Sequence, residues 1–566
     1  MDNIIHEIKV QIADCMQEAL NRAAIEGALP QDVKLPEIVV QKPREKVHGD
    51  FALNVAMQMA KSAKKPPRKI AEELIARMKT ENTYIERMEV AGAGFINVFL
   101  KRQWLYDALH VMHEKGESYG KSQAAPKKKI MVEFVSANPT GPMHMGNARG
   151  GALGDSLAEV LIWAGNDVTR EFYLNNAGAQ IEKLGKSLNA RYIQIIKGED
   201  AVVFPEDGYH GKDIRAHMEA FIQENGTKHL GMPEEERKKI LIDYVLKRNI
   251  QTIQTDLGKY RIHYDVWFPE TSLYESGEVE ETIEELKKSG YAYEQEGAVW
   301  FRSTEFGSDK DDVLIRQNGI PTYFAVDIAY HRNKFIVRGF DKVINVWGAD
   351  HHGHIARMKG AMQALGIDPE RLQVITIQLV RLMNGKEIVR MSKRTGEMVS
   401  LGELIEDIGV DAARFFFNLR QADSHFDFDL ELALTQTNEN PVYYVQYAHA
   451  RICSILRLLR EEDQVTLPAY DKIDMTLLKE EAEKELIEKL AYFPEEIVTA
   501  AQTTDPTRLT HYAMDLAALF HSFYNACRVR CEDQKLMLAR LQLIDFTRGV
   551  IASTLQILGV HAPEKM

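Results

Sequence analysis

The stretch EFVSANPTGPMHMGNARGGALGD, residues 133–155, decides the fold that we predict. It overlaps an apolar, β-branched run, IMVEFVSA at 130–137, which is typical of a buried parallel strand. Proline and glycine then mark a tight connection, and a helix is expected to begin near 144–147. A helix that starts at the carboxyl end of a parallel strand presents free backbone N–H groups where an open α/β sheet binds nucleotides. We therefore predict a phosphate site beside His144, although a glycine-rich packing helix with an incidental histidine would show the same pattern.

A second element, VRMSKRTG at 389–396, lies far downstream of the first. A lysine and a serine in a glycine-flanked loop after an α/β core can clamp the phosphates of a nucleotide as charge develops on them. By itself the loop would be an ordinary solvated basic turn. Together with the first element it indicates a nucleotide site completed by Lys393.

Strand and helix patterns alternate around these two elements, as in a multidomain α/β protein with a Rossmann-like parallel-sheet core. The expected strands lie at 167–174, 298–303, 312–316, 343–349 and 374–380, and helices at 151–165 and 354–366. The predicted domains are an N-terminal α+β unit at 1–110, the α/β core at 125–400 with a charged, helical insertion at about 190–290, a connecting region at 401–440, and an all-helical bundle at 441–566.

Composition excludes several classes of protein. With 566 residues, 45% hydrophobic and 27% charged, the chain can bury several cores and is not disordered. No run approaches 18 apolar residues and the N-terminus is amphipathic, so we expect a cytoplasmic protein without a membrane span. Four cysteines without a CxxC pair indicate free thiols. The net charge of −13 argues against nonspecific coating of nucleic acid but allows a local basic groove.

The two elements resemble the paired signatures of class I aminoacyl-tRNA synthetases. His144-Met-Gly-Asn147 resembles the HIGH signature and Arg390-Met-Ser-Lys393 resembles the KMSK signature. The words EFVSANPTGPMHMGNARG, FYLNNAGAQI and VWGADHHGHIARM narrow the resemblance to arginyl-tRNA synthetases, over most of the chain. The 1–110 unit is similar to that family's additional domain, which implies contact with the tRNA elbow, and the 441–566 bundle is similar to its anticodon-binding domain.

The resemblance implies a role for each matching residue. The implied catalytic residues are His144, Asn147 and Lys393; the ATP-binding residues are Pro142, Met145, Gly146, His352, His354, Met391 and Ser392; the arginine-binding residues are Glu133, Asn138, Tyr323, Asp327 and Asp350; and the tRNA-binding residues are Tyr447, Arg451, Arg457 and Arg528. Asp327 is also the best physical candidate, because a planar guanidinium prefers a carboxylate in bidentate geometry. Three positions depart from the family pattern: Asn147 replaces histidine, Arg390 begins the second signature, and Arg394 follows Lys393 where serine is common.

The implied reaction is ATP-dependent activation of L-arginine to arginyl-adenylate, followed by transfer to the 3′ end of tRNA(Arg). The resemblance further implies that activation requires bound tRNA and that the protein acts as a monomer. Mg²⁺ is expected with ATP, held by phosphates and water rather than by a dedicated protein metal site. The cluster at His351, His352 and His354 invites a zinc interpretation, but no Cys or HExxH pattern accompanies it.

Two rival functions remain to be distinguished. Another class I synthetase, such as the cysteinyl enzyme, would need a zinc site for thiol recognition, which the cysteine positions do not supply. A noncatalytic RNA-binding relative would show decay at His144, Lys393 or the pocket carboxylates, whereas all of them are present. No editing domain is expected, because a pocket built to bond a guanidinium leaves its polar groups unpaired with smaller competitors.

Overall fold

The N-terminal unit is a small antiparallel sheet covered by helices. The computed structural model describes residues 3–30, 36–122, 127–385, 387–389 and 399–566, apart from the side chains of Asp350 and His352. The sheet has the order β1-β2-β4-β3. α1 covers it because its isoleucines at 4, 5, 8 and 12 are buried on one face, and Asn3 caps its first turn. The elements are α1 (Ile4–Ile25), β1 (Val40–Gln41), β2 (Phe51–Leu53), α2 (Val55–Ala63), α3 (Pro67–Ile75), β3 (Ile85–Ala91) and β4 (Phe95–Leu100).

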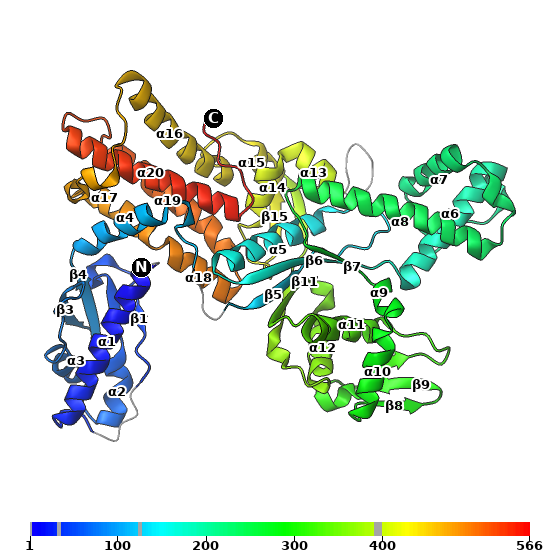
Figure 1. The fold of residues 1–566 in the computed structure, drawn as a ribbon, viewed down its shortest axis with the longest axis horizontal. Helices are drawn as coiled ribbons and strands as arrows, with labels where there is room; N and C mark the ends of the chain where they lie inside the picture. Colours follow the sequence, from blue (N-terminus) through cyan, green and yellow to red (C-terminus); the bar gives the residue numbers. More distant parts are fainter. Residues whose placement is uncertain (1–2, 31–35, 123–126, 386, 390–398) are drawn as a thin grey trace.

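The core of the molecule is a five-stranded parallel sheet of order β12-β11-β5-β6-β7 (Figure 1). The predicted Rossmann-like fold class is thereby confirmed. β5 is followed by α5 and then by β6 on one side, while β11 pairs on its other side, so the strand order reverses at β5. Such a reversal opens a crevice at the carboxyl edge of the sheet. The elements are β5 (Lys129–Glu133), α5 (Met145–Trp163), β6 (Asp167–Leu174), β7 (Val266–Pro269), β11 (Lys342–Gly348) and β12 (Leu372–Ile377).

Three helices project from the core between β6 and β7 and form a core of their own. They bury Leu188, Tyr192, Met218 and Phe221, among others. The predicted insertion at about 190–290 reaches too far, because β7 lies inside that range and pairs in parallel with β6. A four-residue strand between highly charged helices leaves too weak a periodic pattern to be recognised. The helices are α6 (Gly178–Lys197), α7 (Lys212–Asn225) and α8 (Glu234–Lys259).

A second unit between β7 and β11 carries its own antiparallel sheet, of order β10-β9-β8. The strands expected at 298–303 and 312–316 belong to this sheet and not to the parallel one. Periodicity identifies a strand but not its partner, which explains the difference. The elements are α9 (Thr271–Glu275), α10 (Glu278–Lys288), β8 (Ala292–Gln295), β9 (Ala298–Phe301), β10 (Asp312–Ile315), α11 (Tyr323–Arg332) and, after β11, α12 (His352–Ala364).

The chain then forms a small sheet of order β14-β13-β15 and a long helical region. α4 (Gln103–Lys115) leaves the N-terminal unit and packs against α17, so the first and last parts of the chain meet (Figure 1). The elements are β13 (Val380–Asn384), β14 (Glu387–Val389), α13 (Leu401–Ile408), α14 (Val410–Phe417), β15 (Phe426–Asp429), α15 (Leu430–Leu434), α16 (Pro441–Glu462), α17 (Glu481–Ala491), α18 (Phe493–Thr503), α19 (Thr507–Ala526) and α20 (Gln534–Ile557).

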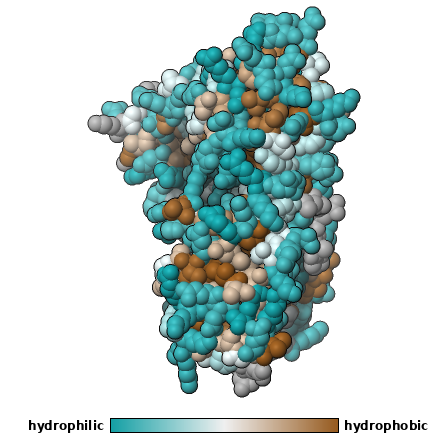
Figure 2. All heavy atoms as spheres, turned by 90° about the vertical axis from the view of Figure 1, so that its left-hand side faces the viewer, coloured by the Kyte–Doolittle hydropathy of each residue, from teal (hydrophilic) through white to brown (hydrophobic). Residues whose placement is uncertain are grey.

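Charged and polar side chains cover most of the face seen from the left-hand side of Figure 1. On this face, apolar residues appear in separate groups between hydrophilic ones (Figure 2). Among the helices that the structure describes, none combines the length and the apolar character needed to cross a bilayer.

Candidate active site

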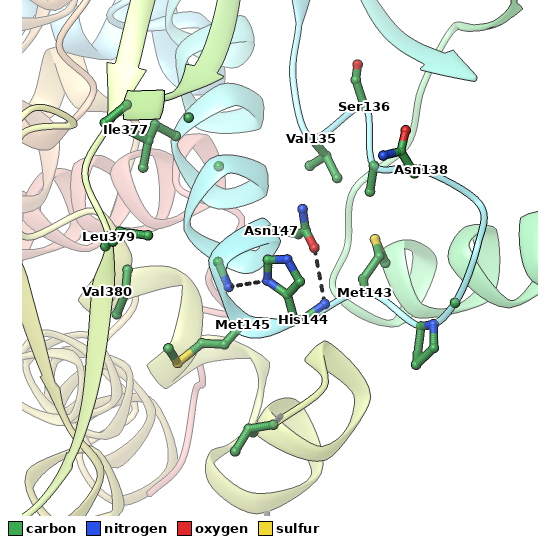
Figure 3. Close-up of a pocket in the computed structure, with 18 of the residues that line it drawn as sticks. Val135, Ser136, Asn138, Met143, His144, Met145, Asn147, Ile377, Leu379 and Val380 are labelled. Atoms are coloured by element: carbon green, nitrogen blue, oxygen red, sulfur yellow. Dashed lines mark hydrogen bonds between the residues drawn. The ribbon is translucent and has the colours of Figure 1, made fainter. Parts of the chain in front are cut away.

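A cavity of about 1330 Å³ opens at the carboxyl ends of β5, β11 and β12. Its walls include residues 135–138 after β5, 140–147 up to the start of α5, 346–349 at the end of β11, and 377–382 from the end of β12 into β13. It lies where the strand order reverses, as expected for a nucleotide site in an open α/β sheet. Its volume is ample for a nucleotide and a second small substrate. Figure 3 shows His144 and Asn147 on one wall and Ile377, Leu379 and Val380 on another.

His144 caps the N-terminus of α5 with its own ring. The backbone N–H of Gly146 donates to His144 Nδ1 at 3.2 Å, and the N–H of His144 donates to Asn147 Oδ1 at 3.1 Å (Figure 3). Burial lowers the pKa of His144, so the ring is neutral at pH 7. Because Nδ1 accepts, the proton of the neutral ring lies on Nε2, which can donate to an anion. Asn147, the departure from the family signature, holds the histidine backbone in place.

The chain on both sides of the second signature reaches the first one. Val389 and Val399 line the same cavity as His144. A backbone bridge joins His144 to Ser400, with the Met145 N–H donating to the carbonyl of Val399 at 3.1 Å. The predicted residues Met391, Ser392 and Lys393, together with Arg390 and Arg394, lie outside the described residues.

The connection between β5 and α5 is strained. Val135 has φ +67° and Ser136 has φ +40°, a left-handed conformation that is rare for a β-branched residue. Ser136 Oγ donates to Glu133 Oε1 at 3.0 Å and accepts from the Tyr173 N–H at 3.1 Å, which holds this backbone in place. Strain of this kind gathers at functional sites, where the surrounding structure imposes a required geometry.

Asp327, on α11, is an ionised carboxylate that has a hydrogen-bond partner in the protein itself. Its Oδ2 accepts from His354 Nε2 at 2.7 Å. Burial raises the pKa of Asp327, but the hydrogen bond from His354 and the positive charge of Lys334 outweigh burial, so the pKa is lowered overall. His354, predicted to bind ATP, therefore contacts Asp327, which is predicted to bind arginine, and is not among the residues that line the cavity.

Glu270 is a second carboxylate beside Asp327, and the sequence analysis did not include it. It directly follows β7 and is 2% exposed, and its Oε1 has no hydrogen-bond partner among the described residues. Burial raises its pKa, a hydrogen bond from Tyr173 lowers it, and the charge of Asp327 raises it again. Its position after a strand at the carboxyl edge of the sheet could have identified it, but β7 was assigned to the insertion.

Glu133 is paired within the protein. Its Oε2 lies 2.5 Å from the ammonium of Lys334, which is completely buried and also donates to Asn345 Oδ1 at 3.1 Å. The amide of Asn345 lies 2.8 Å from His331 Nε2. Burial first, and then the charge of Lys334, lower the pKa of His331 to about 3, so this ring is neutral.

The remaining predicted residues are dispersed around these groups. Asn138, Pro142, Met145 and Gly146 line the cavity. Tyr323 is 47% exposed, and its hydroxyl accepts from the Ala179 N–H at 3.1 Å. The side chains of Asp350 and His352 are outside the described residues. Within the described part of the chain, no three His, Cys, Asp or Glu side chains are arranged to hold a metal ion.

The structure brings two of the four predicted tRNA-binding residues into one aromatic cluster. The Arg451 guanidinium lies 4.2 Å from the centre of the Tyr524 ring, and Tyr447 stacks on His521 at 6.0 Å. Arg457 is on the same helix, α16, and donates to Ser454, while Arg528 is exposed after α19. A half-buried arginine among tyrosines offers stacking faces for unpaired bases.

The fold and the site define a class. The parallel sheet carries a histidine-capped helix at the point where the strand order reverses. Val389 and Val399, which flank the second signature, line the same cavity as that histidine. This is the arrangement of the catalytic core of class I aminoacyl-tRNA synthetases. Family models match at residues 7–100 (arginyl tRNA synthetase N terminal domain), 109–452 (tRNA synthetases class I (R), catalytic domain) and 445–566 (DALR anticodon binding domain).

Full-length relatives identify the family within this class. The chain is 56% identical to the arginine–tRNA ligase of Acetivibrio thermocellus and 57% identical to that of Caldanaerobacter subterraneus subsp. tengcongensis, in each case over all of both chains. The fold matches the Thermus thermophilus arginyl-tRNA synthetase structure with a TM-score of 0.75 at 22% identity, over 98% of this chain and 100% of that one. The chain belongs to the arginyl-tRNA synthetase family.

Proposed function

We propose that the chain is an arginine–tRNA ligase that activates L-arginine with ATP and transfers the arginyl group to the 3′ end of tRNA(Arg). The observation that carries this proposal is the meeting of two unlike sites at one edge of the sheet. A cavity with a helix N-terminus and a neutral histidine suits nucleotide phosphates, and next to it a buried carboxylate, Glu270, and a partly exposed one, Asp327, suit a guanidinium. Activation joins these two substrates, because the arginine carboxylate attacks the α-phosphate and pyrophosphate leaves.

In this proposal, the first signature binds and polarises the phosphates. His144 Nε2 and the free N–H groups of α5 donate to phosphate oxygens, and Asn147 keeps the histidine backbone in position. Pro142, Met145 and Gly146 shape the wall beside the nucleotide. Lys393, whose flanking residues approach His144, adds a positive charge as pyrophosphate leaves, with Met391 and Ser392 beside it. Mg²⁺ accompanies ATP and contacts phosphates and water.

Arginine recognition is assigned mainly to Asp327 and Glu270. Glu270 is buried and keeps one oxygen without a partner among the described residues, while the side chain of Asp327 is 31% exposed. A guanidinium has five donors in a plane and can bond two carboxylates at once, whereas the ammonium of lysine is a compact point charge with three donors. Glu133, already neutralised by Lys334, supports the strained connection before α5, while Asn138, Tyr323 and Asp350 complete the pocket.

The proposal places tRNA across the two ends of the chain. Tyr447, Arg451, Arg457 and Arg528 contact the anticodon, and the 1–110 unit contacts the tRNA elbow. Activation requires bound tRNA, and the protein works as a monomer in the cytoplasm. For contact by both ends, the supporting observation is that α4 and α17 pack the N-terminal unit against the helical region, so the two units adjoin.

The test is arginine-dependent exchange of labelled pyrophosphate into ATP, measured with and without tRNA(Arg). Lysine and cysteine serve as control amino acids. Exchange that appears only with arginine and tRNA(Arg) together supports the proposal in full. Exchange with arginine alone would remove the tRNA requirement, and exchange under no condition would favour a noncatalytic RNA-binding relative.

A further inference from the structure

Arg149 lies on α5, five positions after His144 of the first signature, and none of the proposed catalytic steps uses it. Its side chain is completely buried. Nη1 donates to the carbonyls of Gln378 at 3.0 Å and Ser424 at 2.9 Å, and Nη2 donates to the carbonyl of Gln421 at 2.7 Å. One guanidinium therefore holds backbone from two segments that are far away in sequence.

This arrangement costs free energy that ordinary packing would not require. Burial lowers the pKa of Arg149 to about 10, with nearby Asp423 opposing the shift, so the side chain is a buried cation at neutral pH. Its hydrogen bonds in the described residues go to carbonyl dipoles, and Nε has no partner there. A buried charge is expensive, and an apolar side chain would fill the space at lower cost. The rigid, planar fork supplies what an apolar side chain lacks, a fixed geometry between three carbonyls.

One of the three carbonyls that Arg149 binds, that of Gln378, belongs to the opposite wall of the ATP cavity. Gln378 joins β12 to β13, and both Gln378 and its neighbour Ile377 line the cavity. The N–H of Gln378 donates to the carbonyl of Ala422 at 2.9 Å, so this connection and the turn at 421–424 move as one piece. The base of the β13–β14 hairpin is thus tied to α5 only five positions after His144.

The turn at 421–424 also touches the helical region. The side chain of Gln421 donates to Asp505 Oδ2 at 2.7 Å, at the junction of α18 and α19. The carbonyls bound by Arg149 are therefore fixed to the far wall of the cavity on one side and to the helical region on the other.

We propose that Arg149 is a positioning residue for adenylate formation, which sets the separation between His144 and the β13–β14 hairpin across the ATP cavity. This inference rests on the proposed function. Misplacement of a phosphate-binding element by about 1 Å costs on the order of a hundredfold in rate. Losing the fork releases the β12–β13 connection from α5, whereas the arginine-site carboxylates follow other strands and keep their positions.

The test compares Arg149→Met and Arg149→Lys with a matched control, Arg371→Met, in the full-length protein. Arg371 also binds backbone carbonyls with its guanidinium, those of Asp341 at 3.0 Å and Phe340 at 2.6 Å, but at the amino end of β11 and β12, away from the cavity. Pyrophosphate exchange is measured with tRNA(Arg), rates are normalised to titrated active sites, and thermal unfolding is recorded for each variant.

We expect the Arg149 variants to change the kinetic constants for ATP and to leave those for arginine nearly unchanged. Both Arg149 variants lose about tenfold to a hundredfold in kcat per active site. The KM for ATP rises, while the KM for arginine stays within about twofold of wild type, because the carboxylates assigned to arginine are untouched. Arg371→Met keeps the wild-type constants even if its Tm falls. Three results would overturn the positioning role. They are unchanged kcat and KM for ATP in Arg149→Lys, parallel losses for both substrates, and loss of folded protein in both variants. Absence of exchange in the wild type would instead refute the proposed function.

Discussion

Replacing Asp327 by Asn tests the arginine site directly. The substitution keeps the shape of the side chain and an oxygen that can accept from His354, but it removes the negative charge that the lowered pKa of Asp327 maintains at neutral pH. A hydrogen bond between charged partners contributes about 1.5–3 kcal/mol. With the guanidinium left facing a neutral amide, we expect a loss of about 2–3 kcal/mol, which corresponds to about 30–160-fold in kcat/KM for arginine.

The assay is tRNA-dependent pyrophosphate exchange over a range of arginine and ATP concentrations. The control is Asp341→Asn, because Asp341 accepts from the Lys129 N–H at 2.7 Å at the amino end of the sheet, opposite the cavity. Asp327→Asn should raise the arginine requirement and leave the KM for ATP near that of wild type. Equal losses toward both substrates, or a change no larger than that of Asp341→Asn, would refute the assignment of Asp327 to guanidinium binding.

Three further predictions concern single sites. Glu270→Gln should reduce kcat/KM for arginine about tenfold in the exchange assay, since one charge-assisted hydrogen bond is lost; an unchanged value would remove Glu270 from the pocket. The pKa of His331, lowered to about 3, means that the unfolded chain binds more protons than the folded one between pH 6.5 and 3, so stability falls with decreasing pH in this window. In urea unfolding, the free energy of unfolding should decrease less between pH 7 and pH 5 for His331→Gln than for wild type. Arg414→Met should destabilise the fold by about 1.5–3 kcal/mol, because the buried Asp155 loses the hydrogen bond from Arg414 Nη2 at 2.6 Å but keeps its ion pair with Arg170 at 2.9 Å. The double variant with Asp155→Asn should recover part of the loss in thermal unfolding, and strict additivity would contradict the pairing.

Local patterns predicted the elements around the first signature well. The helix beginning beside His144 and the helix expected over 354–366 are present, and the strand expected over 130–137 is present as β5 but ends at Glu133. These elements depend on interactions between neighbours along the chain, such as the reciprocal caps of His144 and Asn147. Strand partners depend on distant contacts, and this explains why the strands of the β8–β10 unit were assigned to the parallel sheet.

The candidate site was only partly predictable for the same reason. His144 and Asn147, which we predict to bind phosphate, are close together in sequence, so their types and spacing were sufficient to propose a site there. Glu270 meets Asp327 only because β7 joins the central sheet beside β6. His354 was predicted to bind ATP, but its place on α12 brings its ring to Asp327.

The sequence alone determined the class of the protein and its family resemblance, because paired signatures, their order and the surrounding words are properties of the linear chain. The tertiary structure decided which charges remain available to a substrate. Glu133 and Lys334 are 201 positions apart and neutralise each other, while Glu270 keeps an oxygen without a partner among the described residues. Burial and pairing change the free energy of a charge by several kcal/mol, and both arise only when distant segments pack together.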